Sequence, residues 1–195
     1  MTVMEKTASS AKTDQKEIYL VVSQTGSIVS KMLKGVTKAQ YNHISVAFRE
    51  DLEAMYSFGR RLTYFPFWGG FVAESPNHGT MKRFLEARIV VIAVPVSDEV
   101  YKKVHNRIDS MFAERKKYGY NYIGLFLAGI NVPRKTEYRY YCSEFVKELY
   151  TLYHIDGYDQ LPTIAQPEDF LKLPGRRVYK GTLREYVKQK NKVLK

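Results

Sequence analysis

The chain contains a single cysteine, Cys142, among its 195 residues. One thiol excludes an internal disulfide framework and any zinc site that is built from several cysteines. A chain without disulfides fits a reducing compartment, although composition alone does not identify the compartment. We expect neither a metal ion nor a cofactor.

Long apolar runs are also missing. No stretch reaches the roughly 20 apolar residues that a membrane-spanning helix needs. The N-terminus lacks the basic region followed by an apolar core that marks a secretory signal. We therefore expect no transmembrane segment and, by default, a cytoplasmic protein, with export by another route left open.

Charge of one sign is in excess. Lys and Arg number 31 against 20 Asp and Glu, which gives a formal net charge of +11, and 45% of the residues are hydrophobic. This composition is typical of one globular domain. The last 21 residues hold eight Lys and Arg against one acidic residue, Glu185. We expect a flexible leader over residues 1–16, one domain over residues 17–174 and a basic tail over residues 175–195.

The basic tail is suited to several partners. Nucleic acid, an anionic wall polymer and acidic lipid would all attract it, and it is equally typical of a solvated terminus. Nucleic acid is the weakest of these, because the basic residues gather at the terminus instead of interleaving with aromatic ones, and no binding motif is present.

A helix is predicted from about Cys142 to Tyr153, because apolar residues recur there at helical spacing. Cys142 lies in its first turn, on the buried side. A thiol at this place is near free backbone N–H groups and the positive end of the helix dipole, and both favour the thiolate. The alternative is a buried structural cysteine, since free cysteine is among the most buried residue types.

Residues 43–48 alternate with the period of a strand. His43, Ser45 and Ala47 share one face, and apolar side chains share the other. The small neighbours leave room beside the imidazole for a second side chain or a substrate. A structural histidine is the alternative interpretation.

The remaining segments give a coarse map of the fold. Other strands are predicted at residues 18–22, 53–58, 88–96 and 176–180, and other helices at residues 27–34, 99–116, 123–130, 166–173 and 183–190. The run 88–96 is apolar nearly throughout and indicates a central strand, with 176–180 at an edge. Residues 59–80 contain many breakers and aromatics and suggest a long loop, whereas 123–130 suggests a short buried helix.

Two short motifs together point to a known group of enzymes. Tyr41-Asn42-His43-Ile44-Ser45-Val46 has the form of a strand opened by a histidine, and Tyr141-Cys142-Ser143-Glu144-Phe145-Val146 that of a helix opened by a cysteine. The histidine precedes the cysteine, which reverses the order in papain-type enzymes. The sequence thus resembles the circularly permuted papain-fold cysteine hydrolases, the YiiX-like relatives of NlpC-type cell-wall peptidases, which also include the lecithin:retinol acyltransferase group. The resemblance covers about residues 18–153.

The resemblance implies an α+β fold of the permuted papain-like (NlpC-type) kind, in which an antiparallel sheet packs against the helix that carries the cysteine. It also implies that His43 deprotonates Cys142 and that the thiolate forms an acyl-enzyme, which water or another acceptor resolves. The backbone N–H of Cys142 and a second donor, for which Gln24 is the candidate, would hold the oxyanion.

The family usually has a third residue that orients the imidazole from the strand after the histidine strand. By spacing this position falls at Ser57, and the nearest carboxylate is Glu53. A serine is a weak orienting group, so the triad predicted from the sequence is incomplete.

Three classes of function follow. The first is a cysteine hydrolase, an amidase or peptidase acting on cell-wall peptides, with lipid ester or amide hydrolysis or acyl transfer as the alternative chemistry. The second is a non-catalytic binding module on the same fold, favoured by the incomplete triad. The third is a nucleic-acid-binding protein that uses the basic tail.

Overall fold

The computed structural model describes residues 15–25, 40–62, 68–79 and 81–193. They form a mixed α+β fold around one eight-stranded sheet, in the order β7-β6-β4-β3-β2-β1-β5-β8. Neighbouring strands are antiparallel except β6 and β7, which are parallel. The strands are β1 (Lys16–Gln24), β2 (His43–Ala47), β3 (Met55–Arg60), β4 (Gly69–Glu74), β5 (Arg88–Val96), β6 (Gly119–Tyr120), β7 (Arg139–Tyr140) and β8 (Arg176–Thr182).

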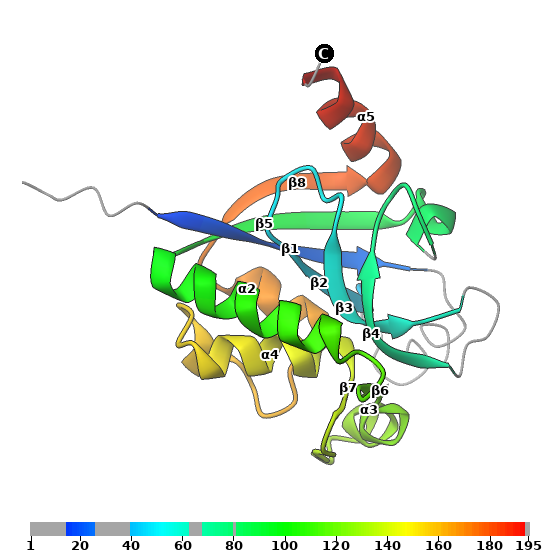
Figure 1. The fold of residues 1–195 in the computed structure, drawn as a ribbon, viewed down its shortest axis with the longest axis vertical. Coiled ribbons are helices and arrows are strands. Elements are labelled where there is room, and N and C mark those ends of the chain that lie inside the picture. The colour runs from blue at the N-terminus through cyan, green and yellow to red at the C-terminus, as the bar shows by residue number, and fades with distance from the viewer. Residues whose placement is uncertain (1–14, 26–39, 63–67, 80, 194–195) are drawn as a thin grey trace, which may run out of the picture.

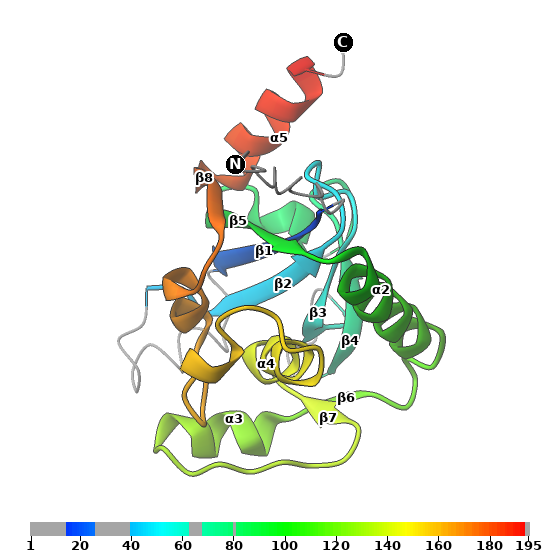
Figure 2. The ribbon, with the colours of Figure 1, turned by 90° about the vertical axis from the view of Figure 1, so that its left-hand side faces the viewer.

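Helices cover both faces of this sheet. Helices α2 (Asp98–Ala113) and α4 (Cys142–Leu152) lie on one face, and α5 (Leu183–Val193) packs on the other, beside β8 (Figure 1). Helix α3 (Tyr122–Gly129) lies at the end of the molecule that carries β6 and β7 (Figure 2). Short 3₁₀ helices span Met81–Phe84, Tyr158–Gln160 and Pro167–Lys172.

Strands β1 and β5 are interior strands of the sheet, with a neighbour on each side. Each is apolar nearly throughout and buried over most of its length, because helices or aromatic side chains cover both faces there. β5 lies between β1 and β8, and β8 has β5 as its one neighbour in the sheet. The predicted edge strand at 176–180 is confirmed as part of β8, whereas the strand predicted to be central at 88–96 is an interior strand next to that edge.

An aromatic cluster joins α4 to the sheet. Phe145 of α4 is fully buried, and its ring centroid lies 5.5 Å from that of Phe58 on β3 and 5.4 Å from that of Phe71 on β4. Such pairs add to the stabilisation that burial provides. This packing holds the first turn of α4 against the strands that carry the polar residues of the candidate site.

The structure corrects two predictions. Residues 59–80 are not one long loop, because residues 69–74 form β4 and pair along their whole length with β3. Residues 123–130 are helical to residue 129 but not buried, since Ile123, Phe126 and Ile130 are exposed. The predicted helix at 27–34 lies outside the described residues, and residues 176–193 of the predicted basic tail form β8 and α5.

We expect Phe145→Ala to lower the free energy of unfolding by about 3–5 kcal/mol, the usual cost of truncating a buried Phe. Urea denaturation followed by circular dichroism measures the loss. Leu152→Ala on the same helix is the control, because Leu152 is 53% exposed and its truncation should change the value by less than about 0.5 kcal/mol. Equal losses in the two variants would contradict this role for Phe145.

Candidate active site

The first turn of α4 positions Cys142. Tyr141 precedes the helix in an extended conformation, and its backbone N–H donates to the Glu144 carboxylate at 3.3 Å. This contact closes the helix start in the manner of a capping box. Cys142 follows as the first helical residue and is 4% exposed. The thiol thus lies where the sequence predicts it, on the buried side of the helix start.

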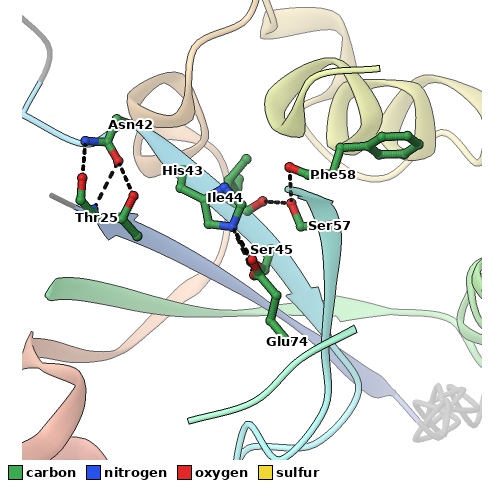
Figure 3. Close-up of polar contacts among 8 residues, drawn as sticks. All are labelled: Thr25, Asn42, His43, Ile44, Ser45, Ser57, Phe58 and Glu74. Carbon is green, nitrogen blue, oxygen red and sulfur yellow. Dashed lines mark hydrogen bonds and ion pairs between the residues drawn. The ribbon is translucent and has the colours of Figure 1, made fainter. Parts of the chain in front are cut away.

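His43 opens β2, and its ring lies against a carboxylate. The Nε2 atom is 2.9 Å from Oε2 and 3.0 Å from Oε1 of Glu74, the last residue of β4 (Figure 3). A carboxylate of this kind only accepts hydrogen bonds, so Nε2 carries the hydrogen. The Ser45 hydroxyl donates to Glu74 Oε2 at 2.7 Å, which fixes the carboxylate in front of the ring.

The two side chains sustain each other's charge. Their exposed fractions are 12% for His43 and 11% for Glu74. Burial alone would lower the pKa of His43, but the Glu74 carboxylate and a hydrogen bond with Cys142 raise this pKa well above its ordinary value of 6.5. Burial alone would raise the pKa of Glu74, but the charge and hydrogen bond of His43 and the hydrogen bond from Ser45 lower it below its ordinary value of 4.5.

Cys142 completes a chain of three groups. The thiol lies close enough to the His43 ring to contribute to the rise in the pKa of this histidine. Because Nε2 contacts Glu74, Nδ1 is the ring nitrogen that remains to act as a base. A thiol, an imidazole and a carboxylate in this sequence of contacts are the parts that an activated nucleophile requires: the nucleophile, its base, and a group that orients the base.

The carboxylate beside the His43 ring belongs to a residue that the sequence did not indicate. Ser57 is fully buried, and its hydroxyl donates to the backbone carbonyl of Ile44 at 2.6 Å (Figure 3), so its hydrogen is taken by the backbone. Glu53 is exposed in the turn before β3. Spacing along the chain suggested these two positions, but the carboxylate at the ring is that of Glu74.

A glycine makes this arrangement possible. A Cβ atom added at Gly59 of β3 would lie 3.2 Å from Glu74 Oε1 and 3.8 Å from His43 Cε1. β3 lies between β2 and β4 in the sheet, and Glu74 therefore reaches His43 past the backbone of Gly59. A larger residue would push the carboxylate away from the ring.

The second oxyanion donor stays a prediction. Gln24 ends β1 and is half-buried, but it is not among the described residues that line the pocket at Cys142. Asn42 lines that pocket. Its side chain is tied to Thr25 by two hydrogen bonds to Oδ1 and one from Nδ2, each 3.0 Å long (Figure 3).

A pocket of about 570 Å³, counted with its open mouth, adjoins Cys142. The enclosed part of this pocket is narrow, with a volume of about 50 Å³. Most of the wall is apolar or aromatic, and the polar side chains include Asn42, Ser143 and Gln166. The full lining is Tyr41, Asn42, Tyr120, Leu125, Ala128, Gly129, Tyr141, Cys142, Ser143, Ile164, Ala165, Gln166 and Pro167.

No metal site accompanies the pocket within the part of the chain that the structure describes, where no group of three or more His, Cys, Asp or Glu could hold an ion. Comparisons with protein-family models, with curated proteins and with solved structures gave no match to this chain. The interpretation of the site therefore relies on its own geometry.

The pair of His43 and Glu74 predicts a pH window for stability. Because the pKa of His43 is raised, protonated His43 stabilises the folded protein fully below pH 6.5, and this stabilisation is lost as pH rises through the raised pKa. Because the pKa of Glu74 is lowered, ionised Glu74 stabilises the folded protein above pH 4.5, and this stabilisation is lost as pH falls through the lowered pKa. Both contributions to stability are present between pH 4.5 and 6.5.

We expect Glu74→Gln to lower the free energy of unfolding by roughly 2 kcal/mol inside this window, and by less on either side. Urea titrations at pH values below, inside and above the window measure the difference. Glu53→Gln removes an exposed carboxylate and serves as the control, with a change below about 0.5 kcal/mol at every pH. A difference that is independent of pH would show that the charge pair does not contribute.

Proposed function

We propose that the chain is a cysteine hydrolase in which Cys142 is the nucleophile, His43 the base and Glu74 the orienting group. The observation that carries the proposal is the contact between the His43 ring and a nearly buried carboxylate, with the one thiol of the chain close enough to raise the pKa of that histidine. The same three roles are those of the permuted papain-fold hydrolases that the sequence resembles.

The reaction follows from these roles. The form that starts the cycle has a neutral His43 ring: the Cys142 proton moves to the free ring nitrogen, and the sulfur attacks the carbonyl carbon of an amide or ester. The tetrahedral intermediate collapses as the leaving amine or alcohol takes the proton from His43, which leaves a thioester on Cys142. Water then attacks the thioester while His43 accepts its proton, and the carboxylic acid departs from the restored thiol. Glu74 keeps the imidazole in one orientation and stabilises its positive charge in both halves of the cycle.

The pocket favours an apolar acyl group. Leu125, Ala128, Ile164 and Ala165 are among the residues that line it next to Cys142. A cell-wall stem peptide presents charged groups, for which the described residues of this wall offer no charged side chain. A fatty acyl amide or ester fits the wall better, so we place lipid-type acyl substrates ahead of wall peptides.

Glu74 weakens the case for a non-catalytic binding module. That alternative depended on the lack of a residue to orient the imidazole, and Glu74 has this role in the proposed triad. The nucleic-acid-binding alternative has no comparable cluster of contacts to support it.

An acyl-enzyme should accumulate at Cys142. We expect p-nitrophenyl octanoate to release a burst of one p-nitrophenolate per chain and to add one octanoyl group, visible by intact mass spectrometry. Cys142→Ser should abolish the burst, and His43→Ala should slow it by about 10²–10⁴-fold, the usual worth of general acid–base catalysis. His105→Ala is the matched control, because His105 is a half-buried histidine on α2 that is not among the described residues lining the pocket at Cys142.

Two outcomes would refute the chemistry. One is a folded wild-type protein without a burst for short- or long-chain esters and without reaction of Cys142 with iodoacetamide. The other is a burst that survives in Cys142→Ser.

The orienting role has its own test. We expect Glu74→Gln to lower the acylation rate by about 10- to 100-fold, which is part of the contribution of general acid–base catalysis, and to shift the pH–rate profile because the His43 pKa falls. Glu53→Gln and Ser57→Ala should leave both nearly unchanged, since neither side chain holds the imidazole. A normal rate and profile in Glu74→Gln would show that the carboxylate is dispensable.

A further inference from the structure

Helix α3 has apolar side chains on two opposite sides. Leu125 and Ala128 line the pocket at Cys142. Ile123, Phe126 and Ile130 point the other way by helical periodicity and are 59%, 65% and 58% exposed. A helix that is apolar all round is normally buried in a protein core or in a membrane. The outer side of α3 faces solvent instead, at the margin of the molecule (Figure 2).

Basic residues bracket this apolar segment. No charged residue occurs from Gly119 to Pro133. Val132, in the turn after α3, is a further exposed apolar side chain at 44%. The exposed basic residues on either side are Arg115, Lys116, Lys117, Arg134 and Lys135. Lys117 forms an ion pair with Glu114. Arg134 and Lys135 are the exposed basic residues that directly follow the segment, with one exposed acid, Glu137, two residues further on.

We propose that the outer side of α3 docks the protein onto the surface of an anionic lipid bilayer. The eight residues of α3 extend about 12 Å, well short of the roughly 30 Å hydrocarbon core. Among the described residues, no helix is long and apolar enough to cross a membrane. α3 therefore lies in the interface, with Ile123, Phe126 and Ile130 among the acyl chains and the basic residues at the headgroups, as in interfacial anchors.

Charge selects lipid over a second copy of the chain. A symmetric dimer through this side would bring together two chains that each carry a net charge of +11, and like charges oppose such a contact. Anionic headgroups neutralise Arg134 and Lys135 instead, and each basic side chain near such a surface strengthens binding roughly fivefold.

Docking through α3 has a consequence for the pocket. The inner side of the same helix forms part of the pocket wall, so the pocket lies about one helix diameter, roughly 10 Å, from the docked surface. An acyl chain that leaves the bilayer beside α3 would have a short path to Cys142. The docking itself does not depend on the chemistry proposed for Cys142.

Co-sedimentation of the full chain with vesicles tests this proposal. We expect binding to vesicles of equal parts phosphatidylglycerol and phosphatidylcholine, weaker binding to pure phosphatidylcholine, and a decrease with added salt. Substituting Ile123→Ser and Phe126→Ser together should weaken binding at least about tenfold by removing the inserted apolar area. Substituting Arg134→Ser and Lys135→Ser together should weaken it about tenfold or more on anionic vesicles only.

Matched controls locate the contact. Leu152→Ser changes a leucine that is 53% exposed at the end of α4 and should leave binding within about twofold. Lys188→Ser with Lys192→Ser removes the same number of charges from α5, which projects from the opposite end of the molecule (Figure 1). That pair should retain the binding that the Arg134 and Lys135 pair loses. Circular dichroism melts establish that every variant is folded.

Three outcomes would overturn the proposal. The first is a wild-type protein that does not sediment with anionic vesicles. The second is loss of binding in the α5 pair with normal binding in the α3 variants, which would assign the contact to the basic C-terminal region. The third is a dimer in sedimentation velocity that Phe126→Ser dissociates, without vesicle binding. Cys142→Ser should bind vesicles like the wild type, so failure of the hydrolase chemistry remains distinguishable from failure of docking.

Discussion

The candidate site depends on the contact between His43 and Glu74. Both side chains are nearly out of water, where an isolated imidazolium would lose its proton and an isolated carboxylate would gain one. Together they remain charged, because each supplies the opposite charge that solvent no longer screens. The Ser45 hydroxyl adds a hydrogen bond to the carboxylate at 2.7 Å, and Gly59 leaves the space in which the two meet. Loss of the carboxylate, of the hydroxyl or of the space at Gly59 would change the surroundings of the His43 ring and therefore its pKa.

The nucleophile and its base belong to different layers of the fold. His43 and Glu74 are on the sheet, whereas Cys142 begins the helix packed on it. The distance between them is therefore set by the packing of α4, in which Phe145 contacts Phe58 and Phe71. The aromatic core therefore determines how far Cys142 lies from His43. Substitutions in this core would change that separation even though they replace no polar residue.

The sequence predicts the parts of the site that have a strong local pattern. Cys142 follows from helical periodicity and His43 from strand alternation, since both patterns reflect burial of one face. Glu74 could not be found in this way. It ends a six-residue strand inside a segment rich in glycine, proline and aromatics, and its role appears only when β4 pairs with β3 and brings the chain back to β2. The burial of α3 was predicted wrongly for a related reason, because apolar composition does not say what covers a helix.

The solitary thiol also determines how the protein would respond to oxidants. A thiol activated by a neighbouring imidazole is readily oxidised to a sulfenic acid. Proteins that use this chemistry for sensing commonly place a second cysteine nearby, which forms a disulfide and protects the sulfur from further oxidation. With Cys142 as the one cysteine in the sequence, the chain has no such partner. Recovery from the sulfenic state would then require a thiol from another molecule, and delay would expose Cys142 to irreversible oxidation.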